Sequence, residues 1–328
     1  MTEPLLTIRD LHLKFRLFEG ISHVLNGVNL FIKKGERVAI VGESGCGKST
    51  AVRAILGLLS NRNATLSGSI RFRGSELINN TNQKLWREIR GRRISMVFQD
   101  PTAALNPVFS VRDQLVNVIR RGSLVKNRKE ALDLARNALK RVSIADPDRI
   151  LSAYPFQLSG GLAQRVMITM ALINRPELVL ADEPGSALDV TVQEQALHLM
   201  RNLTKENGAA VLIITHNLGV VREFAQRVYV MYAGSIVEEA STEELFNNPR
   251  HPYTRALIDA VPKLTGGELP KSIDGVVPDY VNPPSGCRFH TRCSFAESQC
   301  RIPQKMIELG SQHRVACFLA DEKSLSSS

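Results

Sequence analysis

The chain has 328 residues, 43% of them hydrophobic, and a formal net charge of +10 at pH 7. This length suits one large or two modest domains, and the apolar content is enough for a substantial core. No apolar run approaches the ~18 residues of a membrane-spanning helix, and the first residues lack the basic and apolar regions of a secretory signal. We therefore expect a soluble cytosolic protein, which can still dock onto a membrane partner.

Arginines form the densest basic cluster of the chain. Arg87, Arg90, Arg92 and Arg93 follow directly on Trp86. Such a cluster is compatible with nucleic acid or with an anionic surface, but runs of charge are most often solvated faces. We interpret it as a solvated face near acidic lipid, and we expect no nucleic-acid partner.

Strand patterns dominate the first hundred residues. In the first expected strand, Leu5 to Phe15, the candidates for burial are Ile8, Leu11, Leu13 and Phe15. The further strands expected in this part of the chain are Val24–Ile32, Val38–Val41, Ser69–Gly74 and Ile94–Phe98.

A glycine-rich loop lies between the strand that ends at Val41 and a helical stretch. Residues 42–50 read Gly-Glu-Ser-Gly-Cys-Gly-Lys-Ser-Thr, a complete phosphate loop of the form G-x-x-x-x-G-K-[ST]. Its glycines let backbone N–H groups turn toward an anion at a helix N-terminus. Lys48 can reach the β- and γ-phosphates, and the Ser49 hydroxyl can hold Mg²⁺. The residues assigned to nucleotide binding are Gly42, Ser44, Gly45, Cys46, Gly47, Lys48, Ser49 and Thr50. The side chain of Cys46 is a bystander, and the chain is expected to bind a nucleoside triphosphate.

Helical periodicity characterises the middle of the chain, from about Val111 to Ile173. Strand signals return at Leu178–Ala181, Ala210–Thr215, Val228–Met231 and Val237–Ala240. Strands that alternate with helices predict a mainly parallel sheet, with the middle helices as an inserted subdomain. Ser241 to Glu244 has the spacing of a capping box that opens a short helix, and Ser324 to Ser328 is expected to be frayed.

Two acids, Asp182 and Glu183, end the apolar strand that begins at Leu178. At the C-terminal edge of a sheet, Asp182 can support Mg²⁺ through Ser49 or water, and Glu183 can polarise the attacking water. Phosphoryl transfer needs both, because the transferred group is charged and water is a poor nucleophile. Two acids after an apolar run also occur as a helix cap, so this assignment depends on the phosphate loop upstream.

The segment from Leu158 to Gln164 reads Leu-Ser-Gly-Gly-Leu-Ala-Gln, with Ser159 at the position of a helix N-cap. Alone, it is a turn before a helix whose positive end attracts anions. With the phosphate loop and the acidic strand, it resembles the signature Leu-Ser-Gly-Gly-x-x-Gln of the ATP-binding subunits of ATP-binding-cassette (ABC) transporters. In that family the signature of one subunit caps the γ-phosphate held by the phosphate loop of a second. The resemblance thus implies a dimer with sandwiched ATP and nucleotide contacts from Ser159, Gly160, Gly161 and Gln164.

The other elements of this family follow in order. The resemblance assigns Gln99 to the glutamine loop that senses Mg²⁺ and water, Asp189 to the loop that crosses the dimer interface, and His216 to the switch histidine. Phe15 is the expected aromatic that stacks on adenine, with Phe18 nearby as the alternative. The expected catalytic residues are Lys48, Gln99, Glu183 and His216, and the expected Mg²⁺ ligands are Ser49, Gln99 and Asp182.

Two positions depart from the family pattern. Gly185 stands where the family usually has Thr, and Asn217 replaces the Asp that commonly follows the switch histidine. Neither change removes a catalytic group, so we expect hydrolysis. An asymmetric pair of ATP sites is compatible with both departures.

Beyond residue 240, the segments from His251 to Leu257 and from Gly286 to Cys293 resemble the tail of the oligopeptide, dipeptide and nickel branch of the family. Cysteines gather here with the spacing Cys-x5-Cys-x6-Cys-x16-Cys, at Cys287, Cys293, Cys300 and Cys317. A reducing cytosol disfavours disulfides, and four thiolates suit an iron–sulfur cluster or Zn²⁺. Some relatives in this branch carry a [4Fe–4S] cluster at corresponding cysteines. We expect such a cluster in a structural role, with zinc and with unligated or disulfide-bonded thiols as alternatives.

The fold implied is an α/β P-loop NTPase with a RecA-like, mainly parallel core sheet, an antiparallel β subdomain and an inserted α-helical subdomain. Residues 1–240 are expected to form the ABC domain, with the helical subdomain at about 100–175, and residues 241–328 an irregular Cys-rich extension. The implied function is that of the ATP-hydrolysing subunit of an importer of peptides or a related small solute, peripheral on the cytoplasmic face of the bacterial inner membrane. Its implied partners are a second ATP-binding subunit, two permeases and an extracytoplasmic solute-binding protein.

Two other functions are compatible with parts of the sequence. A non-transport ABC ATPase acting on nucleic acid suits the positive charge, but the chain shows neither a second cassette nor a long coiled-coil insertion. A catalytically silent subunit is disfavoured because Lys48, Asp182, Glu183 and His216 are all present.

Overall fold

The computed structural model describes residues 3–59, 63–122, 125, 127–186, 188–261, 273–310 and 312–320. The chain divides into two compact units. The first comprises Met1–Lys33, Arg37–Asn80 and Ile214–Ser328, and the second comprises Lys34–Glu36 and Thr81–Ile213. The expected frayed tail, Ser324 to Ser328, lies outside the described residues.

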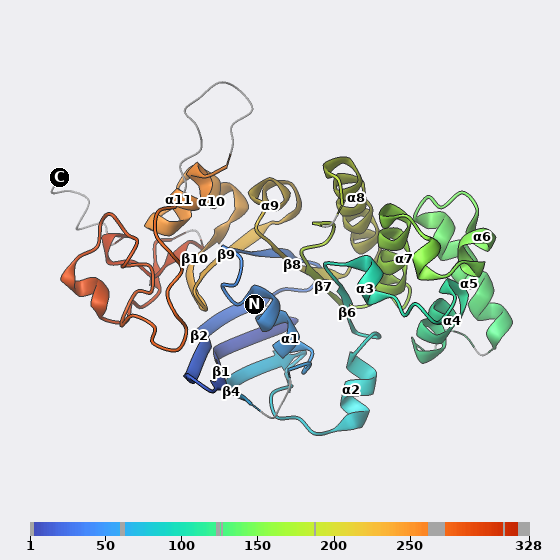
Figure 1. Cartoon of the computed structure of the whole chain (residues 1–328), viewed down its shortest axis with the longest axis horizontal. Coiled ribbons are helices and arrows are strands. Elements are labelled where there is room, and N and C mark those ends of the chain that lie inside the picture. The colour runs from blue at the N-terminus through green and yellow to red at the C-terminus, as the bar shows by residue number, and fades with distance from the viewer. Residues whose placement is uncertain are drawn as a thin grey trace. The chain divides into compact units, whose positions relative to one another are not determined.

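An antiparallel sheet with the strand order β2-β1-β4-β5 opens the first unit (Figure 1). Its strands are β1 (Leu6–Leu17), β2 (Gly20–Ile32), β4 (Ala64–Phe72) and β5 (Ser75–Glu76). Successive side chains of a strand point to opposite faces, yet Ile8 and Leu11 are both buried. The register of β1 shifts between these two residues, and Asp10 takes a left-handed φ of 46°, so a bulge returns Leu11 to the buried face. The expected burial of Ile8, Leu11 and Leu13 is confirmed, whereas Phe15 is half-buried.

The remaining strands of the first unit form a mixed arrangement in the order β11-β12-β10-β9-β3. They are β3 (Arg37–Val41), β9 (Arg227–Tyr232), β10 (Ser235–Ser241), β11 (Ile307–Glu308) and β12 (Arg314–Val315). β3 pairs with β9 in parallel, and the other neighbours are antiparallel. Every residue of β9 is buried, as is typical of a strand that is covered on both faces.

Four α-helices belong to the described part of this unit: α1 (Lys48–Ile55), α9 (Leu218–Phe224), α10 (Thr242–Asn247) and α11 (Pro252–Asp259). Ser241 caps α10, because its hydroxyl accepts a hydrogen bond from the Glu244 N–H at 3.2 Å. The expected helix start at this position is confirmed. Beyond α11 lies the C-terminal segment, of which the structure describes residues 273–310 and 312–320. Its helical parts in these ranges are the short 3₁₀ turns Ser298–Arg301 and Phe318–Ala320.

Three strands and seven α-helices make up the described part of the second unit. The strands are β6 (Ile94–Val97), β7 (Leu178–Asp182) and β8 (Ala210–Thr215), whose last two residues are counted with the first unit. β6 and β7 pair in parallel, and every residue of β7 and β8 is buried. The helices are α2 (Gln83–Ile89), α3 (Pro101–Ala104), α4 (Val111–Gly122), α5 (Arg128–Arg141), α6 (Pro147–Ser152), α7 (Gly160–Leu172) and α8 (Val190–Asn207). The helices expected between residues 111 and 173 are therefore present, whereas α2, α3, α8, α9 and α11 were not predicted individually from the sequence.

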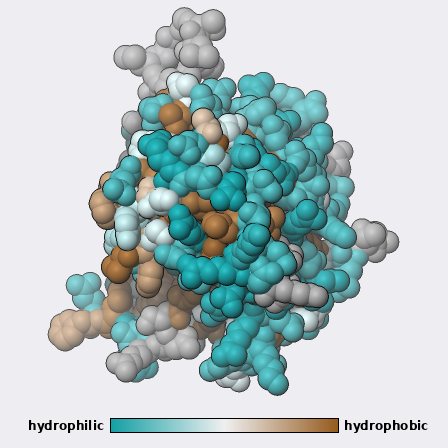
Figure 2. Space-filling view, turned by 90° about the vertical axis from the view of Figure 1, so that its right-hand side faces the viewer, coloured by the Kyte–Doolittle hydropathy of each residue, from teal (hydrophilic) through white to brown (hydrophobic). Residues whose placement is uncertain are grey.

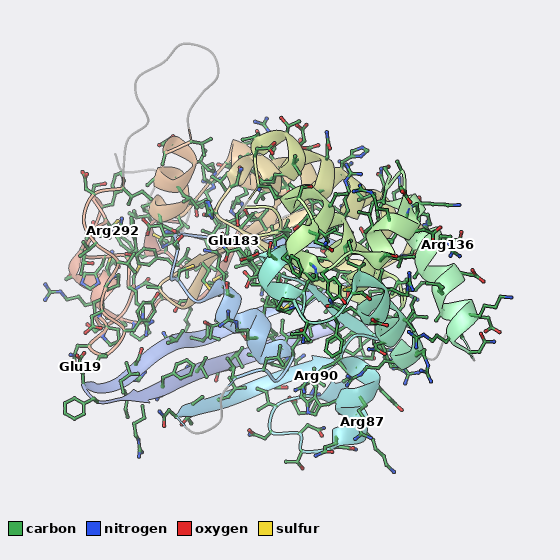
Figure 3. All side chains as sticks on the ribbon, turned by 45° about the vertical axis from the view of Figure 1, so that its right-hand side comes forward. Glu19, Arg87, Arg90, Arg136, Glu183 and Arg292 are labelled. Atoms are coloured by element: carbon green, nitrogen blue, oxygen red, sulfur yellow. The ribbon has the colours of Figure 1, made fainter. Side chains whose placement is uncertain are left out.

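Hydrophilic residues cover most of the face that Figure 2 shows, with apolar residues gathered in smaller groups. No helix of the described residues combines the length and the apolar character that a membrane span requires. In the basic cluster, the Arg90 guanidinium stacks over the Trp86 ring at 4.2 Å, and Arg87 extends from the same helix, α2 (Figure 3). Arg90 is the C-cap of α2, and stacking over the ring stabilises its cation at the end of the helix.

Candidate nucleotide site

The phosphate loop connects β3 to α1 in the first unit. Gly47 is the N-cap of α1 and has a left-handed φ of 104°. Gly42 has a φ of 156°, and a Cβ placed there would lie 2.1 Å from the carbonyl oxygen of Met231. A side chain at position 42 would therefore force β9 or the loop to move, so the glycine is required by close backbone approach.

Lys48 is 4% exposed, and its ammonium lies over the loop. The Nζ atom donates to the carbonyl oxygens of Gly42 and Glu43 at 2.7 and 2.9 Å. Cys46 is buried beside it, and burial raises the pKa of the Cys46 thiol. A neutral, buried thiol agrees with its expected role as a bystander, while the lysine charge and the N-terminus of α1 suit a polyphosphate.

Three side chains from distant parts of the chain contact this loop. The Glu43 N–H donates to the Tyr253 hydroxyl at 2.8 Å, and the Tyr280 hydroxyl donates to the Gly45 carbonyl at 2.9 Å. The guanidinium of Arg292 binds both carboxylate oxygens of Glu43 at 2.8 and 3.1 Å. These contacts were not predicted from the sequence, because the residues that they join are 210 to 249 positions apart and no local pattern indicates such a pairing.

The acidic strand lies in the second unit. Asp182 ends β7 and is 5% exposed. Glu183 follows with a left-handed φ of 44°, an unusual conformation for a residue with a side chain. Gln99 Nε2 donates to Glu183 Oε2 at 3.4 Å, so the structure brings together two of the expected catalytic residues (Glu183 is labelled in Figure 3). Strained backbone of this kind is often found at functional sites.

The signature segment begins α7 in the same unit. Ser159 occupies the N-cap position, and its side chain accepts no capping hydrogen bond. A Cβ on Gly160 would lie 2.9 Å from Leu188, and one on Gly161 would lie 3.1 Å from Val192. The two glycines therefore let the start of α7 approach the loop before α8 and the first turn of α8.

Asp189 and Gln164 have structural positions that the sequence did not predict. The Asp189 carboxylate accepts from the Val192 N–H at 3.0 Å and thereby caps α8. Gln164 is 0% exposed, and neither polar atom of its amide has a hydrogen-bond partner. A contact between Gln164 and nucleotide would require this amide to become exposed, and the assignment stays a prediction.

His216 and Phe15 belong to the first unit. His216 follows β8 and is exposed. The neighbouring Asn217 caps α9, accepting from the N–H groups of Gly219 and Val220 at 2.9 and 3.4 Å. Asn and Asp are equivalent in this role, so the departure from the family pattern preserves the helix start.

The arrangement of the four C-terminal cysteines differs from the metal cluster that was expected. The four cysteines from Cys287 to Cys317 line one cavity together with phenylalanines. However, the described residues include no group of three or more His, Cys, Asp or Glu side chains that could hold a metal ion. The expected [4Fe–4S] cluster is therefore wrong, and the alternative zinc site has no support there either. The thiols are free, and burial raises the pKa of Cys317 to about 11, so this group remains a neutral thiol at pH 7.

These features define a P-loop ATP-binding protein, and comparison with known proteins identifies its family. Residues 25–186 match the family "ABC transporter", and residues 237–300 match "Oligopeptide/dipeptide transporter, C-terminal region". The chain is 47% identical to a probable peptide ABC transporter ATP-binding protein of Sinorhizobium fredii, over 97% of this chain and 96% of the relative. It is 42% identical to the dipeptide transport ATP-binding protein DppD of Bacillus subtilis, over 98% and 96%.

A solved structure agrees with these relatives. The ATP-binding cassette MJ0796, in a dimeric post-hydrolysis state bound to ADP and Pi, superposes with a TM-score of 0.64 at 30% identity. The match covers 72% of this chain and 98% of the cassette. The chain thus belongs to the ABC transporter family, has the fold of an ABC cassette and is an ABC-type ATPase.

Proposed function

We propose that this chain is the ATP-hydrolysing subunit of an importer that takes up peptides. The observation that carries the proposal is similarity along nearly the whole chain to proteins named for peptide and dipeptide transport. The match of residues 237–300 to the oligopeptide and dipeptide C-terminal region supports the same substrate class. A cassette alone would support ATP hydrolysis but no particular solute.

In this proposal the phosphate loop binds the polyphosphate of ATP, and the acidic strand supplies groups for hydrolysis. Lys48 would bind the β- and γ-phosphates, and Ser49 and Asp182 would hold Mg²⁺, which when bound would neutralise charge on the phosphates. Glu183 accepts a proton from the attacking water, and its hydrogen bond from Gln99 orients the carboxylate. The position of Lys48 over its own loop supports the first of these roles.

We further propose that ATP is shared between this chain and a second, related ATP-binding subunit. Ser159, Gly160 and Gly161 would face the γ-phosphate held by the partner, and His216 would contact the γ-phosphate held by this chain. Support comes from Ser159, which begins α7 without a capping bond of its own. An exposed hydroxyl at a helix N-terminus suits an anion.

The proposed assembly contains two permeases and an extracytoplasmic solute-binding protein, with this chain peripheral on the cytoplasmic face of the bacterial inner membrane. Residues 1–240 would form the ATP-binding domain and residues 241–328 the extension. The segment from Asp100 to Val111 would contact a permease, which agrees with the exposure of Val108 and Phe109 at 75% and 51%.

The test is phosphate release by the assembled complex, purified with its permeases and supplied with its binding protein. Peptide-loaded binding protein should stimulate hydrolysis, and the stimulation should be lost with Lys48→Ala. Stimulation by nickel alone would overturn the peptide assignment. Stimulation of the isolated chain by RNA, with none by peptide, would overturn transport itself.

A further inference from the structure

The C-terminal part of the first unit reaches back to the phosphate loop. We name Tyr253, Tyr280 and Arg292 the C-terminal clamp, because each contacts Glu43 or Gly45 of that loop. Tyr253 belongs to α11, and the other two lie in the irregular segment beyond it (Arg292 is labelled in Figure 3). All five residues lie in the same compact unit.

Arg292 is fixed on both sides of its guanidinium. Its side chain is 4% exposed and forms a two-pronged ion pair with Glu43, which is 26% exposed. Its Nε and Nη2 atoms also donate to the carbonyl oxygens of Asp274 and Ile273, at 2.8 and 2.9 Å. A planar guanidinium held in this way imposes one orientation on the carboxylate that it binds.

The two tyrosines hold the loop backbone itself. Tyr253 accepts the Glu43 N–H and is wholly buried, with its ring 4.6 Å from Tyr232 and 5.3 Å from Phe289. Tyr280 donates to the Gly45 carbonyl, and its own carbonyl accepts the His23 N–H at 2.7 Å. Gly45 has a left-handed φ of 80°, a backbone conformation that glycine adopts readily.

We propose that the C-terminal clamp positions the phosphate loop, so that the C-terminal segment sets the affinity of the site for the polyphosphate of ATP. This inference rests on the proposed role of the loop in binding nucleotide. Glu43 and Arg292 are positioning residues, since their side chains bind each other. Because the Gly45 carbonyl and the Glu43 carboxylate are already held by the clamp, the loop is ordered before nucleotide binds, and less binding free energy is spent on ordering it.

The first test compares two arginine-to-glutamine variants of the full chain. Arg292→Gln should weaken binding of Mg·ATP and of ADP about tenfold or more, because a charge-assisted, two-pronged contact is lost. Arg314→Gln is the matched control: Arg314 also joins the C-terminal segment to a glutamate, Glu239, but contacts no part of the loop. It should leave nucleotide affinity unchanged.

Kinetics of the assembled complex separate positioning from simple stability. For Arg292→Gln, the KM for ATP should rise about tenfold, while kcat at saturating ATP stays within about twofold of wild type. Arg292→Lys, which keeps the charge but has no planar fork, should recover part of the affinity. If Arg292→Gln only lowers the unfolding temperature and leaves the dissociation constant unchanged, the clamp is a structural anchor and the proposal is overturned.

Further variants keep the result decisive. Glu43→Gln should reproduce the affinity loss, and the double variant should show no additional loss, because both changes delete one contact; full additivity overturns the proposal. Tyr280→Phe removes a single hydroxyl and should weaken ATP binding about threefold to tenfold, which decides the matter if Arg292→Gln does not fold. Lys48→Ala serves as the reference variant. If it still binds ATP, the role of the loop in binding nucleotide is refuted. If Lys48→Ala abolishes ATP binding but the clamp variants bind ATP like the wild type, only the clamp proposal is refuted.

Discussion

Truncation of His313, the residue before β12, tests how this strand is held against β10. His313 Nε2 and Glu238 Oε1 lie 2.7 Å apart, with the two side chains 3% and 0% exposed. The same carboxylate also accepts the N–H groups of Arg250 and His251 at 2.7 and 2.9 Å. His313→Ala therefore removes the charged partner of a buried carboxylate but leaves two backbone donors.

The structure sets the size of the effect. Breaking a buried ion pair costs about 3–5 kcal/mol when the remaining charge is uncompensated. Because the two N–H groups still solvate Glu238, we expect a loss of about 2–3 kcal/mol in the free energy of unfolding at pH 6. As the pH rises through the raised pKa of His313, the wild-type imidazole loses its charge, and the cost of the substitution falls toward that of a neutral hydrogen bond, about 1 kcal/mol.

The direction of this pH dependence follows from the shifts in the pKa of His313 and in the pKa of Glu238. Burial alone would lower the pKa of His313, but its contacts with Glu238 and Glu244 raise it above 6.5. Burial likewise opposes ionisation of Glu238, but its hydrogen bonds, that from His313 foremost, lower its pKa below 4.5. The stabilisation that the charged histidine contributes is fully present below pH 6.5 and is lost as the pH rises through the raised pKa. The stabilisation that the charged glutamate contributes is present above pH 4.5 and is lost on acidification. Burial lowers the pKa of nearby His251 to about 4, so His251 stays neutral between pH 6 and pH 9.

The assay is urea unfolding of the full chain and of His313→Ala, followed by circular dichroism at both pH values. The cavity left by the truncation is the same at pH 6 and pH 9, so it cancels in the difference. We expect the substitution to cost less free energy of unfolding at pH 9 than at pH 6. Equal costs at the two pH values would refute the ion-pair reasoning.

Substitutions at three further positions test the site. Glu183→Gln should retain ATP binding while slowing phosphate release at least ~10²-fold, because it removes the base; unchanged turnover would exclude that role. Gly42→Ala should abolish ATP binding in a nucleotide titration, since its Cβ would lie 2.1 Å from the Met231 oxygen, and wild-type affinity would contradict this requirement. Asn217→Ala should cost about 1 kcal/mol of unfolding free energy and Asn217→Asp almost nothing; equal losses from both would disprove the cap.

Local patterns predicted the elements around the site well. The strand before the phosphate loop, the helix cap at Ser241 and the acidic end of β7 all follow from side-chain periodicity and capping chemistry over a few residues. The bulge at Asp10 could not be predicted, because nothing in the alternation of β1 distinguishes it from a regular strand. It is set by pairing with β2 and β4.

Contacts between distant segments were beyond sequence reasoning. The pairing of Glu43 with Arg292 spans 249 positions, and each residue alone resembles an ordinary surface charge. The cysteine spacing suggested a cluster, but spacing does not determine whether thiols converge on one point or pack against phenylalanines. Here the four cysteines line one cavity with phenylalanines, and no group of three or more potential metal ligands forms among the described residues.

The most direct test of the account is peptide accumulation in sealed vesicles that carry the reconstituted complex and enclose ATP. With the wild-type chain, labelled peptide supplied outside with its binding protein should accumulate inside against its gradient. With Glu183→Gln, the same vesicles should bind ATP yet accumulate no peptide. Accumulation at the wild-type rate with Glu183→Gln would contradict the claim that hydrolysis by this chain drives uptake.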